Sequence, residues 1–434
     1  MAIKYCSFCG KEYESSDKST VLFKSISSEE TMKTMRICSH CVAKCYELYK
    51  SKMAKEKRKA IEESNVLPTP KEIKQELDQW ILNQDTAIKK ISREYYNHLK
   101  RLKRFELDEN CNNNLRIDKS NMIYMGPTGS GKTETIRALA SFMDLPFVVE
   151  DCSSFTSSGY VGRDCDEILK DLLDAADGDI DKAQKGIVFL DEFDKLKKSS
   201  NVRSGKDVSG EAVQQALLRL VEGGTHKVKK DKQTGSTMDF NTDNVLFIAG
   251  GAFVGLEKII AERLNKDSGA SSVGFGAVLE KENENKYNEL IEQVKPEDLM
   301  TFGLIPEALG RFPVLVPFKE LSIETLMNIL TEPKHAIIKQ FKEMYSFDNN
   351  VDLEFTEQAL GEIAKKAKAK KIGARGLRAV LEEVLDDVGF EYPSIENLSK
   401  IIIKGDLTHE YIIEEKQIEE DMDEEESLTA PEEA

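Results

Sequence analysis

The sequence predicts an α/β fold: a parallel sheet with helices on both faces, a small mainly helical domain after it and a cysteine-rich module before it. Four apolar runs, MIYM, PFVV, IVFL and VLFIA, alternate with helical patterns between residues 121 and 252. Strands that are apolar throughout and alternate with helices are typical of parallel sheets buried on both faces. After residue 317 the pattern becomes mainly helical, and five of the eight cysteines lie within the first 45 residues.

The order of these patterns divides the 434 residues into five expected segments. They are a cysteine-rich module over residues 1–50, a charged linker over 51–66, a large α/β domain over 67–317, a small helical domain over 318–408 and an acidic disordered tail over 409–434. In the small domain we expect helices over 322–345, 356–370 and 374–389, and a short strand near 399–404. At roughly 150 residues per domain, the length agrees with about three folded parts.

The large domain is expected to begin with two helices. Thr69 can cap the first helix, with Pro70 in the first helical position and Glu72 completing the capping box. An amphipathic pattern predicts the second helix from about Thr86 to Arg104.

The negative charge is concentrated at the C-terminal end. Between Glu410 and Ala434, twelve Asp and Glu residues accompany one Lys, a local charge of −11 out of −17, so the remainder carries −6. An acidic segment of this kind is typical of a disordered, solvating tail. Because the remainder is not basic either, no nucleic-acid partner is expected.

No apolar run approaches the ~20 residues that span a bilayer, so no membrane partner is expected. The N-terminal sequence MAIKYCSFCG has no apolar signal core. A cytoplasmic location is therefore expected for a bacterial chain. In such a reducing compartment, clustered cysteines favour metal binding over disulfides.

A phosphate-binding loop follows the first apolar run. The stretch GPTGSGKT matches GxxxxGK(S/T) between an expected strand and an expected helix, where backbone N–H groups and a helix N-terminus can surround phosphate oxygens. The lysine should reach the β- and γ-phosphates and the last threonine should ligate Mg²⁺. The residues expected to bind the cofactor here are Gly126, Pro127, Thr128, Gly129, Ser130, Gly131, Lys132, Thr133 and Glu134.

A pair of carboxylates ends the apolar run IVFL, some 55–60 residues after the phosphate loop. Asp191 is expected to hold Mg²⁺ through water, and Glu192 to polarise an attacking water. Binding alone would not need the second carboxylate, so the pair predicts hydrolysis.

Three further motifs identify a family. They are GYVG at Gly159–Gly162, GLIPEALGR ending at Arg311, and GARGLR starting at Gly373. With the two nucleotide motifs and the cysteine cluster, the chain resembles the ClpX family, the AAA+ unfoldase subunits of the Clp protease. The resemblance runs from about Leu67 to about Ser394 and more loosely over residues 1–50.

The resemblance implies a homo-hexamer with ATP held between neighbouring subunits. Arg311 would be the arginine finger presented to the next subunit, so that Lys132, Glu192 and Arg311 carry hydrolysis. Arg375 would be the sensor arginine of the small domain. Ile81 and Leu82 would form apolar walls for adenine, and Asn83 stands where the family usually has glycine.

The resemblance also implies two loops that act on other proteins. Gly159, Tyr160, Val161 and Gly162 would grip protein substrates in a central pore, with residues 199–209 as a second pore loop. In the family, an aliphatic-Gly-Phe tripeptide docks on the peptidase ClpP. Here the tripeptide would be Val273, Gly274 and Phe275, with Val in place of the usual Ile or Leu.

The cysteines form two CxxC pairs, which is the spacing of tetrahedral Zn²⁺ sites. The expected ligands are Cys6, Cys9, Cys38 and Cys41, with His40 and Cys45 as alternatives. The separation of the pairs is longer than we expect for the family. In the family this module dimerises and receives adaptors.

These observations predict an ATP-dependent protein unfoldase that threads substrates through a hexameric pore and delivers them to a ClpP-type peptidase, with ATP, Mg²⁺ and Zn²⁺ as cofactors. A stand-alone AAA+ remodelling chaperone without a peptidase partner is the alternative. A DNA-acting AAA+ loader or helicase is less favoured, because the chain is acidic and the expected pore loop is aromatic.

Overall fold

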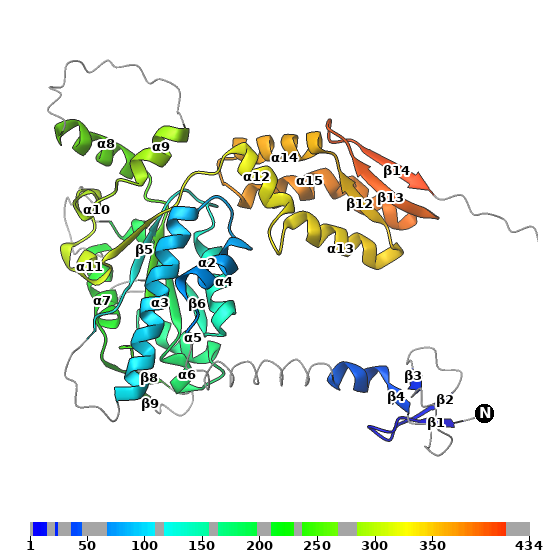
Figure 1. Ribbon diagram of the computed structural model, residues 1–434, viewed down its shortest axis with the longest axis horizontal. Helices are drawn as coiled ribbons and strands as arrows, with labels where there is room; N and C mark the ends of the chain where they lie inside the picture. The colour runs from blue at the N-terminus through cyan, green and yellow to red at the C-terminus, as the bar shows by residue number, and fades with distance from the viewer. Residues whose placement is uncertain are drawn as a thin grey trace, which may run out of the picture. The chain divides into compact units, whose positions relative to one another are not determined.

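The computed structural model describes residues 3–14, 22–24, 36–45, 67–108, 117–155, 164–197, 210–229, 237–267 and 284–413 (Figure 1). The chain forms two compact units, Met1–Pro68 and Thr69–Ala434. Within the described ranges, none of the helices combines the length and apolar character that crossing a bilayer would require.

The first unit is built from two short antiparallel pairs. Strand β1 (Ile3–Tyr5) pairs with β2 (Glu12–Glu14), and β3 (Leu22–Lys24) pairs with β4 (Arg36–Cys38). Residues 39–45 are helical. Its buried apolar side chains are cysteines, Cys6, Cys38 and Cys41, so this unit has almost no hydrocarbon core of its own among the described residues.

The second unit contains the predicted parallel sheet, in the order β11-β5-β10-β7-β6. Its strands are β5 (Met122–Met125), β6 (Phe147–Asp151), β7 (Ile187–Asp191), β10 (Leu246–Gly251) and β11 (Val314–Pro317). All four neighbouring pairs are parallel. Every residue of β5 and β10 is buried, so both faces of the sheet are covered, as the apolar runs predicted.

Helices make up most of the remainder of the large domain. They are α2 (Pro70–Asp78), α3 (Asp85–Asp108), α4 (Lys132–Met143), α5 (Glu167–Ala175), α6 (Ile180–Ala183), α7 (Gly210–Glu222), α8 (Leu256–Asp267), α9 (Glu284–Ile291), α10 (Pro296–Phe302) and α11 (Pro306–Arg311). Short 3₁₀ turns η1 (Cys152–Ser154) and η2 (Phe193–Leu196) follow β6 and β7, and β8 (Thr225–Lys229) pairs with β9 (Thr237–Asn241). Thr69 caps α2 in a full capping box with Glu72, as expected.

The small domain is mainly helical, as expected, and also contains a three-stranded sheet that was not expected. Its helices are α12 (Ile323–Thr331), α13 (Ile337–Asn349), α14 (Glu357–Ala369) and α15 (Arg375–Glu391), followed by the 3₁₀ turn η3 (Tyr392–Ser394). A second sheet, β12-β13-β14, lies beside them and consists of β12 (Asp352–Phe355), β13 (Leu398–Ile403) and β14 (His409–Ile413).

Two expectations for this domain were wrong. The helix predicted over 322–345 is two helices, because the chain breaks around Pro333, where a helix interior would lack an N–H donor. The acidic tail does not begin at residue 409, because His409–Ile413 pairs with β13 and Glu410 forms an ion pair of 2.9 Å with Lys404. The folded domain therefore extends to at least Ile413.

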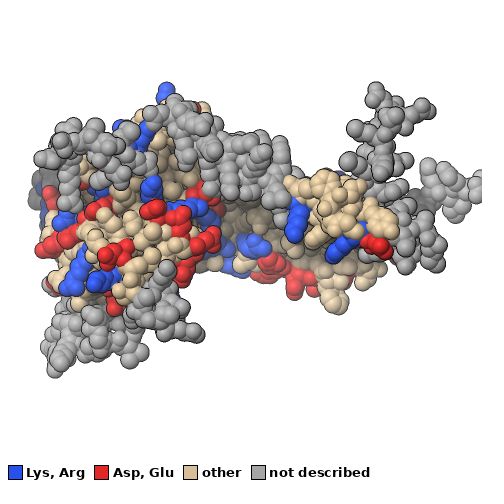
Figure 2. All heavy atoms as spheres, turned by 90° about the horizontal axis from the view of Figure 1, so that it is seen from below, with Lys and Arg blue, Asp and Glu red and all other residues tan. Residues whose placement is uncertain are grey.

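Each domain of the second unit has its own core. One large cluster of buried side chains joins the parallel sheet to α5, α7, α8, α10 and α11, and a second fills the small domain between its helices and β13. On the face drawn in Figure 2, basic and acidic side chains alternate and do not gather into one basic field.

Candidate functional site

The phosphate loop connects β5 to α4 and turns through three glycines with positive φ: Gly126, Gly129 and Gly131. Lys132, the first residue of α4, is buried and donates hydrogen bonds to the carbonyl oxygens of Gly126 (2.7 Å) and Pro127 (2.8 Å). The lysine ammonium is therefore held by two carbonyl oxygens of its own loop, and its contact with phosphate stays a prediction.

Two of these glycines are also required by close packing. A Cβ atom on Gly126 would lie 2.5 Å from the carbonyl oxygen of Phe318, and one on Gly129 would lie 2.3 Å from that of Ile372. Conversely, a Cβ atom on Gly373 would lie 2.4 Å from the carbonyl oxygen of Thr128. The phosphate loop is thus in direct backbone contact with the turn that precedes α15 of the small domain.

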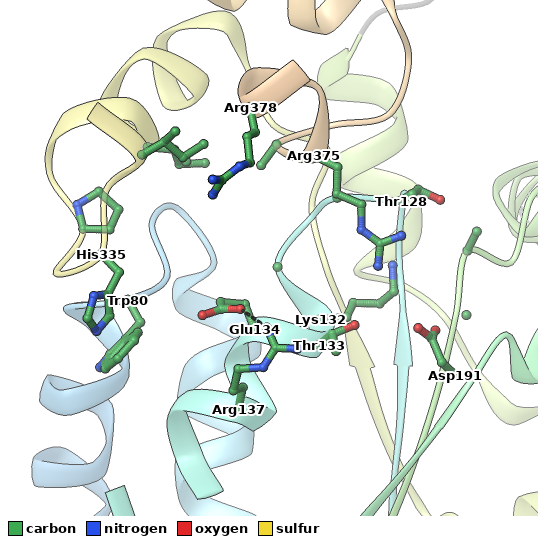
Figure 3. Close-up of a pocket in the computed structure, with 18 of the residues that line it drawn as sticks. Trp80, Thr128, Lys132, Thr133, Glu134, Arg137, Asp191, His335, Arg375 and Arg378 are labelled. Carbon is green, nitrogen blue, oxygen red and sulfur yellow. Dashed lines mark hydrogen bonds and ion pairs between the residues drawn. The ribbon is translucent and has the colours of Figure 1, made fainter. Parts of the chain in front are cut away.

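The carboxylate pair lies beside this loop, at the carboxyl end of β7. Asp191 accepts a hydrogen bond from the backbone N–H of Glu192 (2.9 Å), and Glu192 adopts a left-handed conformation with φ 53° that directs the chain into η2. Figure 3 shows the Asp191 carboxylate and the Lys132 ammonium on facing sides of the same cavity.

A third carboxylate, not expected from the sequence, lies close by. Asp194 is 5% exposed and accepts a hydrogen bond from the backbone N–H of Phe253 (3.3 Å). A Cβ atom on Gly251 would lie 2.4 Å from its Oδ1 atom, so the glycine at the end of β10 makes room for it. The signal was its position in DEFD, three residues after Asp191 and just beyond the strand end.

Burial lowers the pKa of Lys132 to about 8 from its usual 10.5, and the positive charge of Arg375 acts in the same direction. The carboxylates of Asp191 and Asp194 oppose the shift. A desolvated ammonium gains strongly from an anionic partner, so the site is prepared for phosphate oxygens.

These residues line a cavity of about 770 Å³ between the large and small domains. The large domain contributes the phosphate loop, Asp191, Glu192 and Asp194, and the small domain contributes His335, Arg375 and Arg378 among others. Figure 3 shows the guanidinium of Arg375 extending toward Lys132. The volume lies in the usual range for cofactor sites.

The expected contact of Ile81 and Leu82 with the base stays a prediction. Ile81 and Leu82 are not among the residues that line the cavity, although a Cβ atom on Gly131 would lie 3.5 Å from Cδ1 of Ile81. Trp80 lines the cavity instead, and its ring lies 4.7 Å from that of His335. Both rings lie at the end of the cavity away from Lys132 (Figure 3).

Arg311 lies away from this cavity. It ends α11, its side chain is 51% exposed, and it forms an ion pair with Glu222 at 2.9 Å. Asn121, which is buried, donates to the Arg311 carbonyl oxygen (3.0 Å) and accepts from the Phe247 N–H (3.1 Å). The Arg311 backbone is thus anchored by a buried side chain, while its own side chain is exposed.

The four expected cysteines converge in the first unit. The sulfur atoms of Cys6, Cys9, Cys38 and Cys41 all lie within 4.8 Å of one another, and those of Cys9 and Cys38 are 4.0 Å apart. Tetrahedral zinc with Zn–S bonds of about 2.3 Å requires sulfur separations of about 3.8 Å. The alternatives His40 and Cys45 are exposed and are not part of this group.

The Cys6 sulfur is prepared to be a thiolate. Burial raises its pKa, but backbone hydrogen bonds, including one from the N–H of Cys38 (3.3 Å), more than offset that effect and bring the pKa to about 6. The donor set, its geometry and its hydrogen bonds all fit zinc.

Several expected residues lie outside the described ranges. They are the pore residues Gly159, Tyr160, Val161 and Gly162, the second pore loop over 199–209, and the docking residues Val273, Gly274 and Phe275. Their roles remain predictions.

Comparison with known proteins agrees with this geometry. Residues 117–315 match the family described as "AAA domain (Cdc48 subfamily)", and residues 321–406 match "C-terminal, D2-small domain, of ClpB protein". Relatives named "ATP-dependent Clp protease ATP-binding subunit ClpX" include one from Treponema denticola, 42% identical over 92% of both chains. Those from Borrelia duttonii and Borrelia recurrentis are 41% identical over 93% of this chain and 90% of theirs. The chain therefore belongs to the ClpX family of AAA ATPases.

Proposed function

We propose that this protein is an ATP-dependent unfoldase that threads protein substrates through a hexameric pore and delivers them to a ClpP-type peptidase. The observation that carries the ATPase part is the cavity between the two domains. It combines a phosphate loop, the pair Asp191 and Glu192, and an arginine from the opposite domain. The names of the relatives support the partnership with the Clp protease.

Each group in the cavity has a distinct role in this proposal. Lys132 exchanges its carbonyl partners for the β- and γ-phosphates, and Thr133 and Asp191 hold Mg²⁺. Glu192 orients and polarises the attacking water. Arg375 contacts the nucleotide from the small domain, so a change at the γ-phosphate alters how the two domains pack.

Arg311 completes the site of the neighbouring subunit in this proposal. An arginine finger contributes roughly 10³–10⁵ in rate in related phosphoryl-transfer enzymes. Its exposed side chain and its anchored backbone suit a group that must reach across a subunit boundary while its base stays fixed.

Zn²⁺ held by the four cysteines is expected to stabilise the N-terminal module, which would receive adaptors. The pore residues Tyr160 and Val161 would grip the substrate, and Val273–Phe275 would dock on the peptidase. Val in place of the usual Ile or Leu removes about one methylene, worth ~0.8 kcal/mol of burial per loop, which several simultaneous contacts can tolerate.

The central test is Glu192→Gln. This variant is expected to bind ATP and retain substrate while hydrolysis falls by at least ~10²-fold, because the water loses its base. Tyr160→Ala is the matched control, since it should hydrolyse ATP but unfold a tagged fluorescent protein poorly. Normal hydrolysis by Glu192→Gln would overturn the assignment of the base.

A stand-alone remodelling chaperone is the second candidate, favoured by the shortened docking side chain. Deleting residues 272–276 separates the two. Loss of ClpP-dependent degradation with unfolding retained supports peptidase delivery through this loop. Absence of ClpP-dependent degradation by the wild type, with unfolding present, supports the stand-alone function, and unchanged degradation after the deletion would show that residues 272–276 are not the docking element.

A further inference from the structure

The segment that joins the two domains of the second unit, residues 318–322, is held by amide side chains on both sides. Gln84 is 2% exposed and pairs with the backbone of Lys319 in both directions: its Oε1 accepts from the N–H (2.9 Å) and its Nε2 donates to the carbonyl (3.0 Å). Asn288 of α9 does the same at Glu320, at 2.7 and 3.4 Å.

Gln84 also reaches the phosphate loop. Its Nε2 atom lies 3.4 Å from the carbonyl oxygen of Ser130, in a buried position. One side chain therefore contacts both the loop that would bind phosphate and the segment about which the small domain would turn.

The preceding residue extends this connection into the small domain itself. Asn83 donates from Nδ2 to Oγ1 of Thr325 at 2.7 Å. Thr325 lies in the first turn of α12 and is 5% exposed, and its hydroxyl is 2.9 Å from that of the N-cap residue Ser322.

The backbone at Asn83 does not itself require asparagine. Its φ is 58°, a left-handed conformation that glycine adopts without steric cost and asparagine adopts better than most residues. Glycine is also the residue that the resemblance leads us to expect here. What asparagine adds is the hydrogen bond to the small domain.

We propose that Asn83 is a positioning residue, and that its bond to Thr325 fixes the angle of the small domain and so places Arg375 against the nucleotide. This inference rests on the proposed ATPase function. The small domain brings His335, Arg375 and Arg378 to the cavity as one body. Arg375 and Arg378 belong to α15 and His335 lies in the turn between α12 and α13, and these helices pack on a common core. A hydrogen bond at the first turn of α12 therefore helps to set where these three side chains lie relative to the phosphate loop.

The variant that tests this is Asn83→Gly, which keeps the backbone conformation and removes only the amide. Losing one hydrogen bond between domains should raise the Kd for the fluorescent analogue mant-ATP and the KM for ATP by about two- to tenfold. The change in kcat should be smaller, because Lys132 and Glu192 are untouched. Thr325→Val should have at least the same effect, because it also removes the contact with the Ser322 hydroxyl, and the double variant should be no worse than Thr325→Val alone.

Thr325→Ser keeps the hydroxyl and is the matched control, expected to behave as wild type. Trp80 provides a readout independent of activity: it is the only tryptophan and its ring lies 4.7 Å from that of His335 in the small domain. Its emission without nucleotide should change in Asn83→Gly and Thr325→Val but not in Thr325→Ser.

Wild-type KM and wild-type Trp80 emission in Asn83→Gly, or additive effects in the double variant, would overturn the positioning role. The variant Lys132→Ala distinguishes a failure of the positioning role of Asn83 from a failure of the proposed ATPase function. If Lys132→Ala still binds mant-ATP normally, the ATP site itself is wrong. If it abolishes binding while Asn83→Gly binds as wild type, only the role of Asn83 is wrong.

Discussion

Lys132 is a cation held by two carbonyl oxygens of its own loop in a buried position. Burial lowers its pKa to about 8, so the ammonium loses its proton as the pH rises through that value. Binding of phosphate above this pH requires the lysine to take up a proton again, which weakens affinity.

We therefore expect the Kd for ATP to rise by up to about tenfold per pH unit above pH 8, with one proton linked to binding. Equilibrium binding of mant-ATP between pH 7.5 and 9.5 measures this. In Lys132→Arg any remaining affinity should vary less with pH, because a guanidinium stays charged. Constant affinity of the wild type across the range would contradict the expectation.

His98 of α3 is a buried titratable group far from any proposed chemistry. It is 1% exposed, and neither ring nitrogen has a hydrogen-bond partner among the described residues. Burial, with smaller contributions from Arg101 and Lys119, lowers its pKa from 6.5 to about 3. The folded protein therefore keeps this ring neutral where the unfolded chain is protonated.

Because the unfolded state binds the extra proton below pH 6.5, stability falls as the pH decreases from 6.5 toward 3. The expected loss from His98 alone is about 2 kcal/mol between pH 7.5 and 5.0. Urea unfolding of the wild type and of His98→Leu, each at pH 7.5 and 5.0, isolates the contribution of His98, because all other groups titrate alike in the two proteins. Equal losses in the two proteins would refute the contribution.

Among the elements, the four-cysteine group replaces a hydrocarbon core in the first unit. Among its described residues the buried apolar side chains are themselves cysteines, so bound zinc is expected to supply most of the folding free energy. Structural zinc contributes on the order of 10–16 kcal/mol in small modules.

Cys38→Ser should therefore release zinc and expose the amides of residues 3–45 to hydrogen exchange, while mant-ATP binding by the second unit changes little. Cys45→Ser should retain one zinc per chain, because Cys45 is outside the group. Zinc content by atomic absorption, with hydrogen exchange, measures both. Retention of zinc by Cys38→Ser would show that the ligand set is different.

The elements also show what the sequence could predict. Strands β5, β6, β7 and β10 contain apolar runs, and the sequence predicted all four in the correct order along the chain. The polar hairpin β8–β9 and strands β12 and β14 were not, because they depend on pairing with distant partners and carry charged residues on exposed faces. Asp191 and Lys132 follow from motif spacing, but Trp80 and His335 meet only through the packing of the two domains.

For the whole molecule, the proposed hexamer makes every active site a joint product of two subunits. Such a head-to-tail interface closes into a ring in which one surface donates Arg311 and the other holds the nucleotide. Subunits defective on opposite sides should then complement each other.

Glu192→Gln and Arg311→Ala should each be inactive alone, yet an equimolar mixture assembled together should recover about a quarter of wild-type ATPase activity. A quarter of randomly formed head-to-tail interfaces would join an intact Glu192 to an intact Arg311. Steady-state ATPase assays after mixing and reassembly measure this. Continued inactivity of the mixture, despite wild-type assembly, would argue that each subunit hydrolyses ATP without help from its neighbour.

The backbone contact between Gly129 and Gly373 limits which substitutions these two positions can tolerate. Each position already carries the smallest possible side chain, and each has a positive φ. A larger side chain at one of these positions cannot be accommodated by a smaller one at the other, because both are already glycine. No pair of substitutions at the two positions is therefore expected to compensate. In a saturation library selected for ATPase function, both sites should therefore return glycine almost exclusively, on any genetic background.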